Sequence, residues 1–401
     1  MEFEQPVKKR KIWPVVVLVF LFSVLIGCAV AFLIFANHPG KAEEETPVIP
    51  PAPTPTAASS RVLMAGTTFW GRRTNNLARK SELGVAYPFS QLSTLKPEDY
   101  NSWITNLECP ITDNGHDPYN EDTLLKFNCD PDYLPEASKY FKVFSLGTNH
   151  VDNWDEVGIE TTKQNLKQYG IQYFGSTKYD DGENNCSVIV IPTDVTYSDG
   201  EKKSFSIPFG FCSAHGVFGI PTVEVRANIE SYAKIIPTIV MPHMGAEYKD
   251  SADDIRTALY HEMIDLGAEM VVADHPHWIQ NTEAYNGKLI AYSLGNFMFD
   301  QTFNEEVSRG AALDATVTIE NPDDIKNLEA WDELGKICLE NDGDCLDEIK
   351  SAGLKKMDLS WKFDMFGTTS AGDCITRLAS ESEQQAILNR LNWQETVKSL
   401  K

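Results

Sequence analysis

Positive charge is scarce in this 401-residue sequence. Its 35 Lys and Arg residues stand against 58 Asp and Glu residues, which gives a formal net charge of −23 at pH 7. Such a surface repels polyanions, so we expect no nucleic-acid partner. An anionic substrate would need a local positive centre, such as a bound metal, to approach against this field.

The sequence also lacks motifs that would define a function class. It contains no P-loop, no dinucleotide-binding glycine fingerprint and no internal repeat, so the usual signals of nucleotide-binding and repeat proteins are missing. Its eight cysteines follow no zinc-ribbon spacing, and we expect no cysteine-ligated metal. Cys338 and Cys345 are the best-placed local disulfide pair. The odd number of cysteines after Cys28 leaves at least one free or paired between chains.

Charged side chains are absent from residues 13–36, a stretch longer than the roughly 20 residues that span a bilayer as a helix. Residues 8–11 are all Lys or Arg, and this asymmetry predicts a single-pass cell-membrane protein. Residues 1–12 would be cytoplasmic and the main domain extracytoplasmic. Lipoprotein cleavage before Cys28 is the alternative. The Pro-rich residues 37–60 predict an extended linker.

Short apolar runs alternate with helical patterns from residue 61 onward. Predicted strands lie at 62–65, 104–107, 143–146, 171–174, 188–191, 206–211, 235–241, 270–273 and 289–292. Predicted helices lie at 157–169 and 252–266, and a glycine follows each. The alternation predicts a layered α/β domain over 61–320 with functional residues beyond the strand ends. Residues 321–401 form a partly helical C-terminal extension, with a late strand at 361–366 and a terminal helix at 380–399.

Two histidines separated by one proline, His275 and His277, follow the predicted buried strand at 270–273. Proline blocks helix and favours an extended backbone before it, so both rings are expected on one side of an extended segment. His243 follows another predicted strand, at 235–241. Imidazoles gathered at strand ends predict a divalent-metal site.

Five segments carry a more specific signal. They read Met-Ala-Gly-Thr-Thr-Phe-Trp-Gly-Arg at 64–72, Asn-Leu-Glu-Cys-Pro at 106–110, Ser-Leu-Gly-Thr-Asn-His at 145–150, His-Met-Gly-Ala-Glu-Tyr at 243–248, and His-Pro-His at 275–277 joined to Tyr-Ser-Leu-Gly-Asn-Phe at 292–297. Their order and wording resemble the CapA family of capsule or poly-γ-glutamate synthesis proteins. The resemblance implies a four-layer α/β/β/α calcineurin-like metallophosphatase sandwich, preceded here by one transmembrane helix.

The resemblance also implies roles for individual residues. Glu108 would be the metal-bridging acid, Asn149 a metal ligand, and His150 a proton donor or a stabiliser of the transition state. His243, His275 and His277 would complete the metal shell. Glu247 would act on the substrate or support a metal ligand.

One departure from the family pattern changes the expected metal content. Where the family reads Gly-Asp, this chain has Gly66 and Thr67, and a neutral hydroxyl is a poor substitute for a carboxylate ligand. Asp274 also departs, because a Gly-His pair often precedes the His-Pro-His motif. Two neighbouring cations need more negative charge than remains. We therefore expect one divalent ion (Mn, Zn, Fe or Mg) rather than two.

Each candidate also has a structural alternative. His243 could be a hydrogen-bonded histidine at a strand end, and Asn149 with His150 could form a polar turn or a helix cap. Glu108 could be a solvated acid at a strand end, and Glu247 an exposed carboxylate. His215, His261 and His116 show no spacing signal.

These observations predict a membrane-anchored extracytoplasmic protein of capsule or poly-γ-glutamate synthesis. As an enzyme it would perform metal-assisted hydrolysis or transfer at a phosphoester or an amide. The alternative is a non-catalytic scaffold or polymer-binding component of the same machinery. Expected partners are the membrane, an anionic cell-surface polymer and other capsule-synthesis membrane proteins.

Overall fold

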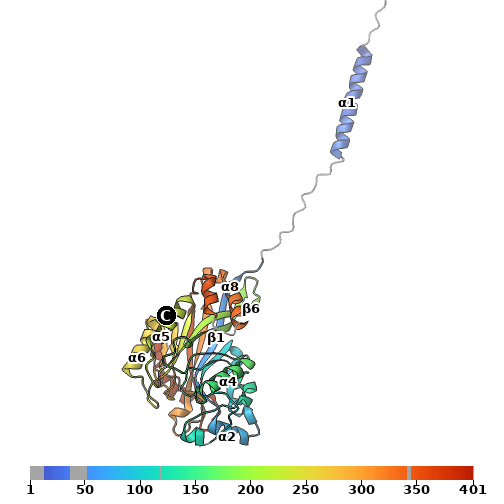
Figure 1. The fold of residues 1–401 in the computed structure, drawn as a ribbon. Helices are drawn as coiled ribbons and strands as arrows, with labels where there is room; N and C mark the ends of the chain where they lie inside the picture. The colour runs from blue at the N-terminus through green and yellow to red at the C-terminus, as the bar shows by residue number, and fades with distance from the viewer. Residues whose placement is uncertain (1–12, 37–51, 118, 341–344, 401) are drawn as a thin grey trace, which may run out of the picture. The chain divides into compact units, whose positions relative to one another are not determined.

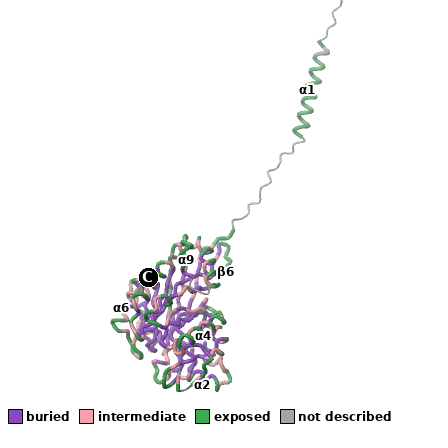
Figure 2. Tube along the Cα trace, viewed as in Figure 1, coloured by how far each residue is buried: buried purple, intermediate pink, exposed green. Residues whose placement is uncertain are grey.

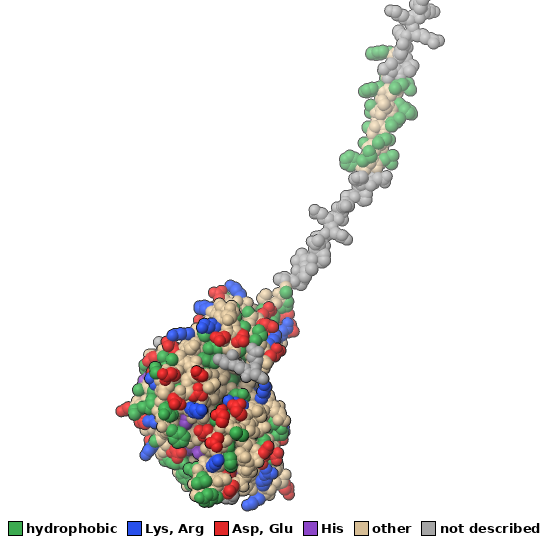
Figure 3. Space-filling model, in the orientation of Figure 1, with side chains coloured by type: hydrophobic (Ala, Val, Ile, Leu, Met, Phe, Trp, Pro, Cys, Tyr) green, Lys and Arg blue, Asp and Glu red, His purple; other side chains and the backbone are tan. Residues whose placement is uncertain are grey.

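The computed structural model describes residues 13–36, 52–117, 119–340 and 345–400 (Figure 1). They belong to two units, Met1–Ala52 and Pro53–Lys401. Helix α1 (Trp13–Ala36) lies in the first unit, and its part Val17–Ala36 is long and apolar enough to cross a membrane. The apolar side chains from Val17 onward are exposed along the helix (Figure 3). The predicted apolar helix is therefore present; the predicted cytoplasmic segment 1–12 lies outside the described residues.

Strand β1 (Pro55–Thr68) is the centre of the second unit. It pairs antiparallel with β12 (Arg309–Ile319) along most of its length, while its first residues pair with β5 (Cys186–Tyr197) and its later residues pair parallel with β2 (Ser102–Leu107). The sheet therefore divides at β1. Residues 55–60, predicted as the end of the linker, belong to this strand.

One branch of the sheet runs β14-β13-β12-β1-β5-β6-β7-β8-β10-β9, and a second branch, β2-β3-β4, leaves from β1, which also pairs with β11. The remaining strands are β3 (Phe141–Ser145), β4 (Gln172–Phe174), β6 (Lys202–His215), β7 (Thr238–His243), β8 (Met270–Val272), β9 (Thr282–Tyr285), β10 (Lys288–Ala291), β11 (Asn296–Met298), β13 (Ser360–Thr369) and β14 (Arg377–Leu378). The α-helices are α2 (Arg72–Lys80), α3 (Leu134–Ala137), α4 (Asp155–Gln168), α5 (Val223–Ile235), α6 (Asp254–Asp265), α7 (Pro322–Lys326), α8 (Leu328–Glu340), α9 (Leu346–Ala352), α10 (Glu381–Arg390) and α11 (Trp393–Ser399).

Alternation along β1 separates two hydrophobic cores. Val62 and Met64 point into a core shared with β5 to β8 and with α5 and α6, whereas Leu63 and Ala65 point into a core shared with β2, β3, α2 and α4. Helices α5 and α6 therefore cover one side of the branched sheet and α2 and α4 the other (Figure 1). The buried residues lie in the interior of this unit (Figure 2). This arrangement confirms the predicted α/β/β/α architecture.

The predicted helices agree with α4 and α6, and the nine predicted strands all contain or overlap observed ones. The prediction of a single strand over the apolar run 235–241 is wrong at its start: Ile235 ends α5, and β7 begins only at Thr238. A continuous apolar run does not distinguish the end of a buried helix from the start of a buried strand. Helix α5 and the long strand β12 were not predicted.

The C-terminal region belongs to the same compact unit. Strand β13, predicted at 361–366, pairs with β12 over ten registered positions. Helix α8 packs so closely on β6 that a Cβ built on Gly335 would lie 1.8 Å from the Ser206 carbonyl oxygen. The backbone N–H of Ser206 donates a hydrogen bond of 2.6 Å to Asp332. The predicted disulfide between Cys338 and Cys345 is present.

Candidate metal centre

The predicted site residues follow the carboxyl ends of strands that run in the same direction. Strand β1 is parallel to β2, β2 to β3, and β6 to β7 and β8, so these strand ends meet at one edge of the sheets. The side chains there have low solvent exposure: Glu108 1%, Asn149 7%, His243 0%, His275 2% and His277 3%. The alternative of a solvated strand-end acid is therefore wrong for Glu108.

Three of these side chains converge on one point. His243 Nε2 lies 2.9 Å from Asn149 Oδ1 and 3.2 Å from His275 Nδ1. Burial lowers the pKa of both histidines well below the usual value, so both rings are neutral at pH 7. Nε2 of His243 carries at most one hydrogen, so it cannot donate a full hydrogen bond to both Asn149 Oδ1 and His275 Nδ1. Ligand atoms at roughly 2.0–2.2 Å from a metal ion lie about 3 Å apart, which agrees with this trio.

His277 belongs to a neighbouring group of side chains. Its Nδ1–H donates a hydrogen bond of 2.8 Å to Asn296 Oδ1, and its Nε2 lies 3.7 Å from Glu108 Oε1. The Asn296 amide is itself held by a bond of 2.9 Å from Nδ2 to the Val307 carbonyl. Asn296 therefore sets the tautomer of His277 and leaves Nε2 as the nitrogen available to a cation.

The backbone at the His-Pro-His motif is not extended, so that prediction was wrong. His275 has φ of 105° and His277 has φ of 59°, both in the left-handed region that L-residues rarely adopt. Proline excludes right-handed helix at the preceding residue but does not enforce an extended strand. The bend holds the two ring centroids 6.0 Å apart and turns His275 toward His243 and His277 toward Glu108. Strain of this kind is common at functional sites.

Two buried carboxylates lie beside the histidines. Neither oxygen of Glu108 has a hydrogen-bond partner, and Asp274, which is fully buried, accepts a hydrogen bond from Thr67 at Oδ2. Burial, and after it the negative charge of Asp274, raises the pKa of Glu108 well above its usual value. Burial raises the pKa of Asp274 to about 7, although the hydroxyl of Thr67 opposes the shift.

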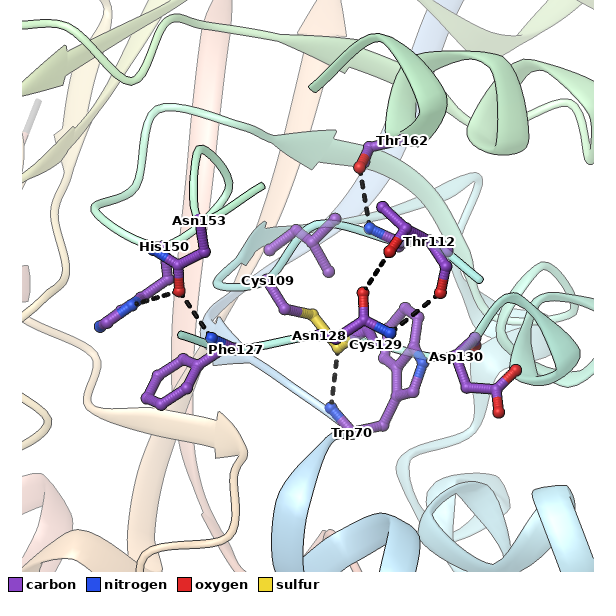
Figure 4. Close-up of a disulfide and its surroundings, with 12 residues drawn as sticks. Trp70, Cys109, Thr112, Phe127, Asn128, Cys129, Asp130, His150, Asn153 and Thr162 are labelled. Carbon is purple, nitrogen blue, oxygen red and sulfur yellow. Dashed lines mark hydrogen bonds between the residues drawn. A yellow bond between two sulfur atoms is a disulfide. The ribbon is translucent and has the colours of Figure 1, made fainter. Parts of the chain in front are cut away.

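His150 lies in the wall of a cleft rather than among the converging ligands. Its Nδ1–H donates a hydrogen bond of 3.0 Å to Asn153 Oδ1, and its ring stacks on Phe127 with centroids 3.9 Å apart (Figure 4). Burial lowers the pKa of His150 to about 4. At pH 7 the ring is therefore neutral and accepts a proton before it donates one.

The cleft has a volume of about 770 Å³ and reaches from α2 to Glu108 and His277. Glu247 is an exposed residue of its wall, and the residues that line the cleft do not include the trio formed by Asn149, His243 and His275. Arg72 also lines the cleft, but its guanidinium is occupied by a two-point ion pair with Asp300. Arg73 and Lys80 in the same wall have no acidic partner among the ion pairs of the described residues.

A disulfide that was not predicted from the sequence supports this wall. Cys109, directly after Glu108, is bonded to Cys129, whose sulfur also accepts a hydrogen bond of 3.4 Å from the backbone N–H of Trp70 (Figure 4). Two residues before Cys129, the Phe127 N–H donates a bond of 2.7 Å to Asn153. The segment between the two cysteines therefore begins next to Glu108 and, through Phe127, contacts the part of the cleft wall that contains His150. Cys spacing alone contains no signal for this pairing.

His215 was also missed, because no motif surrounds it. It ends β6, is in register with His243 on β7, and is 2% exposed. Its two ring nitrogens have no hydrogen-bond partner, and burial lowers its pKa to about 4. The only available signal was its position at the end of the apolar strand β6.

The donor set fits a divalent cation. Asn149, His243 and His275 supply one oxygen and two neutral nitrogens, and the two oxygens of Glu108 are buried without a partner. Among the described residues, no three side chains of His, Cys, Asp and Glu alone gather around one position, so the Asn149 amide is needed to complete the trio. The predicted metal itself stays a prediction.

Comparison with known proteins identifies the family. Residues 61–301, more than half of the chain, match the family described as bacterial capsule synthesis protein PGA_cap. The chain belongs to this capsule synthesis family. All of the predicted site residues, from Glu108 to His277, lie inside the matched region of the family.

Individual relatives of the capsule synthesis family are distant. Capsule biosynthesis protein CapA of Bacillus anthracis is 26% identical over 257 residues, or 59% of this chain and 59% of that protein. PGA biosynthesis protein CapA of Bacillus subtilis strain 168 is 31% identical over 182 residues, or 43% of this chain and 46% of that protein. The chain thus spans less than two thirds of the length of these relatives. The crystal structure of TT1561 of Thermus thermophilus covers 64% of this chain and 94% of its own, with a TM-score of 0.35 and 8% identity, too low to support an argument.

We predict that His215 makes this protein lose stability in acid. The unfolded chain binds a proton at His215 near pH 6.5, whereas the folded protein does so only near pH 4. Between these values the unfolded state binds more protons and is favoured as the pH falls. From pH 7 to pH 5 this one group removes about 2 kcal/mol of unfolding free energy.

Urea unfolding of the metal-free protein in EDTA at both pH values measures this effect. His215→Gln should lose about 2 kcal/mol less than the wild type over the same interval. His261→Gln is the control, because His261 is partly exposed and pairs with Glu283 at 3.0 Å. Identical pH dependence of the wild type and His215→Gln would contradict the prediction.

Proposed function

We propose that this chain is a membrane-anchored component of capsule synthesis whose exterior domain carries a metal-dependent hydrolase or transferase site. The substrate would be a phosphoester or an amide of an anionic cell-surface polymer, with poly-γ-glutamate as the leading candidate. The convergence of Asn149 Oδ1 and His275 Nδ1 on His243 Nε2, at 2.9 and 3.2 Å, carries the proposal. The family to which the chain belongs supports the assignment to capsule synthesis.

The residues around the cleft have separable tasks in this proposal. Asn149, His243 and His275 would hold a divalent ion, which supplies a Lewis acid for the attacked group. Glu108 and His277, 3.7 Å apart, would face the same space from the side of the cleft. His150 is oriented by Asn153 and accepts a proton in the cleft wall.

The proposed cellular arrangement follows from the charges next to the apolar helix. Residues 8–11 are basic, which favours a cytoplasmic N-terminus and an exterior domain. Arg73 and Lys80 give the cleft two cationic side chains without acidic partners among the described residues. They are the local positive centre that an anionic polymer needs at a protein with a net charge of −23. Other capsule-synthesis membrane proteins are the expected protein partners.

A second candidate is a non-catalytic scaffold that binds polymer. Thr67 favours it, because the first strand ends in a hydroxyl where the family has a carboxylate, and a site with fewer acidic ligands is a weaker centre for hydrolysis. Metal binding without metal-dependent cleavage of poly-γ-glutamate or of a model phosphodiester would favour the scaffold function over the enzymatic one.

We predict that the full chain in detergent, stripped with EDTA, binds Mn²⁺ or Zn²⁺ in an isothermal titration. Loss of a direct ligand should exceed the effect of losing a supporting residue, so His243→Ala should weaken binding by more than about 100-fold. His261→Ala, a histidine paired with Glu283 outside the site, is the matched control and should bind as the wild type does. A wild-type protein that takes up neither ion would rule out the metal-dependent function.

A further inference from the structure

Asp274 is held rigidly at the strand edge between the histidines. Its N–H donates to the Pro242 carbonyl at 2.9 Å, and its own carbonyl accepts from the Met244 N–H at 3.1 Å, so its backbone is bridged to the strand that ends in His243. The residue is fully buried and directly precedes His275. Its carboxylate therefore has no freedom to reach solvent.

The side chain of Asp274 is oriented by Thr67. The Thr67 hydroxyl donates to Asp274 Oδ2, while Oδ1 is buried without a hydrogen-bond partner. The two oxygens of Glu108, a residue that is 1% exposed, are also buried without a hydrogen-bond partner. Three carboxylate oxygens are thus buried in one place without a hydrogen bond of ordinary geometry, although the side chains of Asn106 and Ser293 oppose the rise in the pKa of Asp274. In native proteins nearly all buried polar atoms have a hydrogen-bond partner, so a group of buried oxygens without one requires an explanation.

Among the described residues, neither carboxylate forms an ion pair with a Lys or Arg side chain. Arg72, the cation that acts on Glu108, is committed to Asp300 through two hydrogen bonds, and the neighbouring histidines are neutral. Ionising two buried carboxylates that have no cationic partner is costly in a dry interior, and a divalent cation between them removes that cost. The missing partner therefore has the chemistry of a metal ion.

We propose that Asp274 is an acidic metal ligand of this site and replaces the carboxylate that position 67 lacks. The inference rests on the metal-dependent function proposed above. The ligand has moved from the end of β1 to the end of β8, and Thr67 now serves as the hydroxyl that aims it. Asp274 and Glu108 together provide two negative charges, so the loss at position 67 leaves the total charge of the site unchanged.

The test is Mn²⁺ titration of the full chain in detergent. Asp274→Asn should weaken binding by more than about 100-fold or remove one bound ion, and the swapped variant Thr67→Asp/Asp274→Asn should recover binding to within about tenfold of the wild type. Asp332→Asn is the control, because Asp332 is a buried carboxylate that accepts from Ser206 and pairs with Lys336 at 2.6 Å, away from the site.

The outcomes separate the two proposals. Equal Mn²⁺ binding by the wild type and Asp274→Asn would overturn the role of Asp274 and leave the metal-dependent function standing. A swapped variant as weak as Asp274→Asn would also overturn it. No binding by the wild type would overturn both proposals.

Thermal unfolding gives a second readout that needs no activity. At pH 8 in EDTA, Asp274→Asn should raise the midpoint, because it removes an uncompensated buried charge. In excess Mn²⁺ the order should reverse, because only the wild type gains the full binding energy. A residue that merely accepts the Thr67 hydrogen bond would lower the midpoint under both conditions when replaced, and that result would overturn the inference.

Discussion

Gly66→Ala is expected to lower the unfolding free energy by about 3 kcal/mol or more, at the upper end of the range for overpacking a well-packed core. A Cβ at this position would lie 1.9 Å from the carbonyl oxygen of Gly295, and this oxygen belongs to backbone that cannot rotate away. The next residue, Thr67, donates its N–H to the same oxygen at 3.1 Å. The substitution therefore forces β1 away from the turn that precedes β11.

The same displacement should reach the candidate metal centre. Thr67 is registered with Asn296 on β11, and Asn296 orients His277. Folded Gly66→Ala protein should thus bind Mn²⁺ less tightly than the wild type does.

Urea unfolding monitored by tryptophan fluorescence measures the loss of stability, and Gly170→Ala is the control. Position 170 has φ of 66° but open space around the Cβ, so that variant has backbone strain without crowding and should lose only about 1 kcal/mol. Equal losses in the two variants would show that the close approach of Gly66 to Gly295 is unimportant.

Removing the Cys109–Cys129 disulfide, as Cys109→Ala/Cys129→Ala, is expected to lower the unfolding free energy by about 3 kcal/mol. The two cysteines are 20 residues apart, and the cross-link restricts the unfolded chain over that loop. Metal affinity should fall as well. Cys109 directly follows Glu108, and the bridged segment also contains Phe127, on which His150 stacks.

Denaturant unfolding and Mn²⁺ titration, carried out on the same double variant, measure both effects. Cys338→Ala/Cys345→Ala is the matched control, because its shorter loop of seven residues should cost roughly 1 kcal/mol less and lies outside the site. That control should retain the metal affinity of the wild type. If both double variants lost affinity equally, the disulfide next to Glu108 would have no specific role in the site.

The sequence predicted which strand ends form the site, because the end of a buried strand can be recognised from neighbouring residues. Apolar runs of four to eight residues followed by a polar residue marked the ends of β2, β3, β7 and β8, and parallel strands bring such ends to one edge. The buried positions of Glu108, His243 and His277 follow from that rule. Pairing between distant strands has no such local signal. Strand β12 pairs with β1, about 250 residues away in the sequence, and the residues of β12 do not indicate which strand it pairs with.

The finer grouping of the site was also beyond the sequence. His275 and His277 were expected to share one side of an extended strand. Their left-handed backbone instead directs the two rings to different partners: His275 contacts His243, and His277 lies near Glu108. Asp274 was visible only as a departure from a pattern, and its contact with Thr67 depends on how the ends of β8 and β1 meet. The Cys109–Cys129 pair depends on the path of the segment between them.

By itself, the sequence determined that this chain has an apolar helix near its start, an α/β domain with alternating strands, and the five segments of the capsule synthesis family. Those properties depend on periodicity and on residues close together in the chain. Only the tertiary structure decided which buried carboxylates lack partners and which imidazole faces which ligand. Such relations depend on backbone bends and on contacts between strands more than 100 residues apart, as between Thr67 and Asp274, where local preference contains no information.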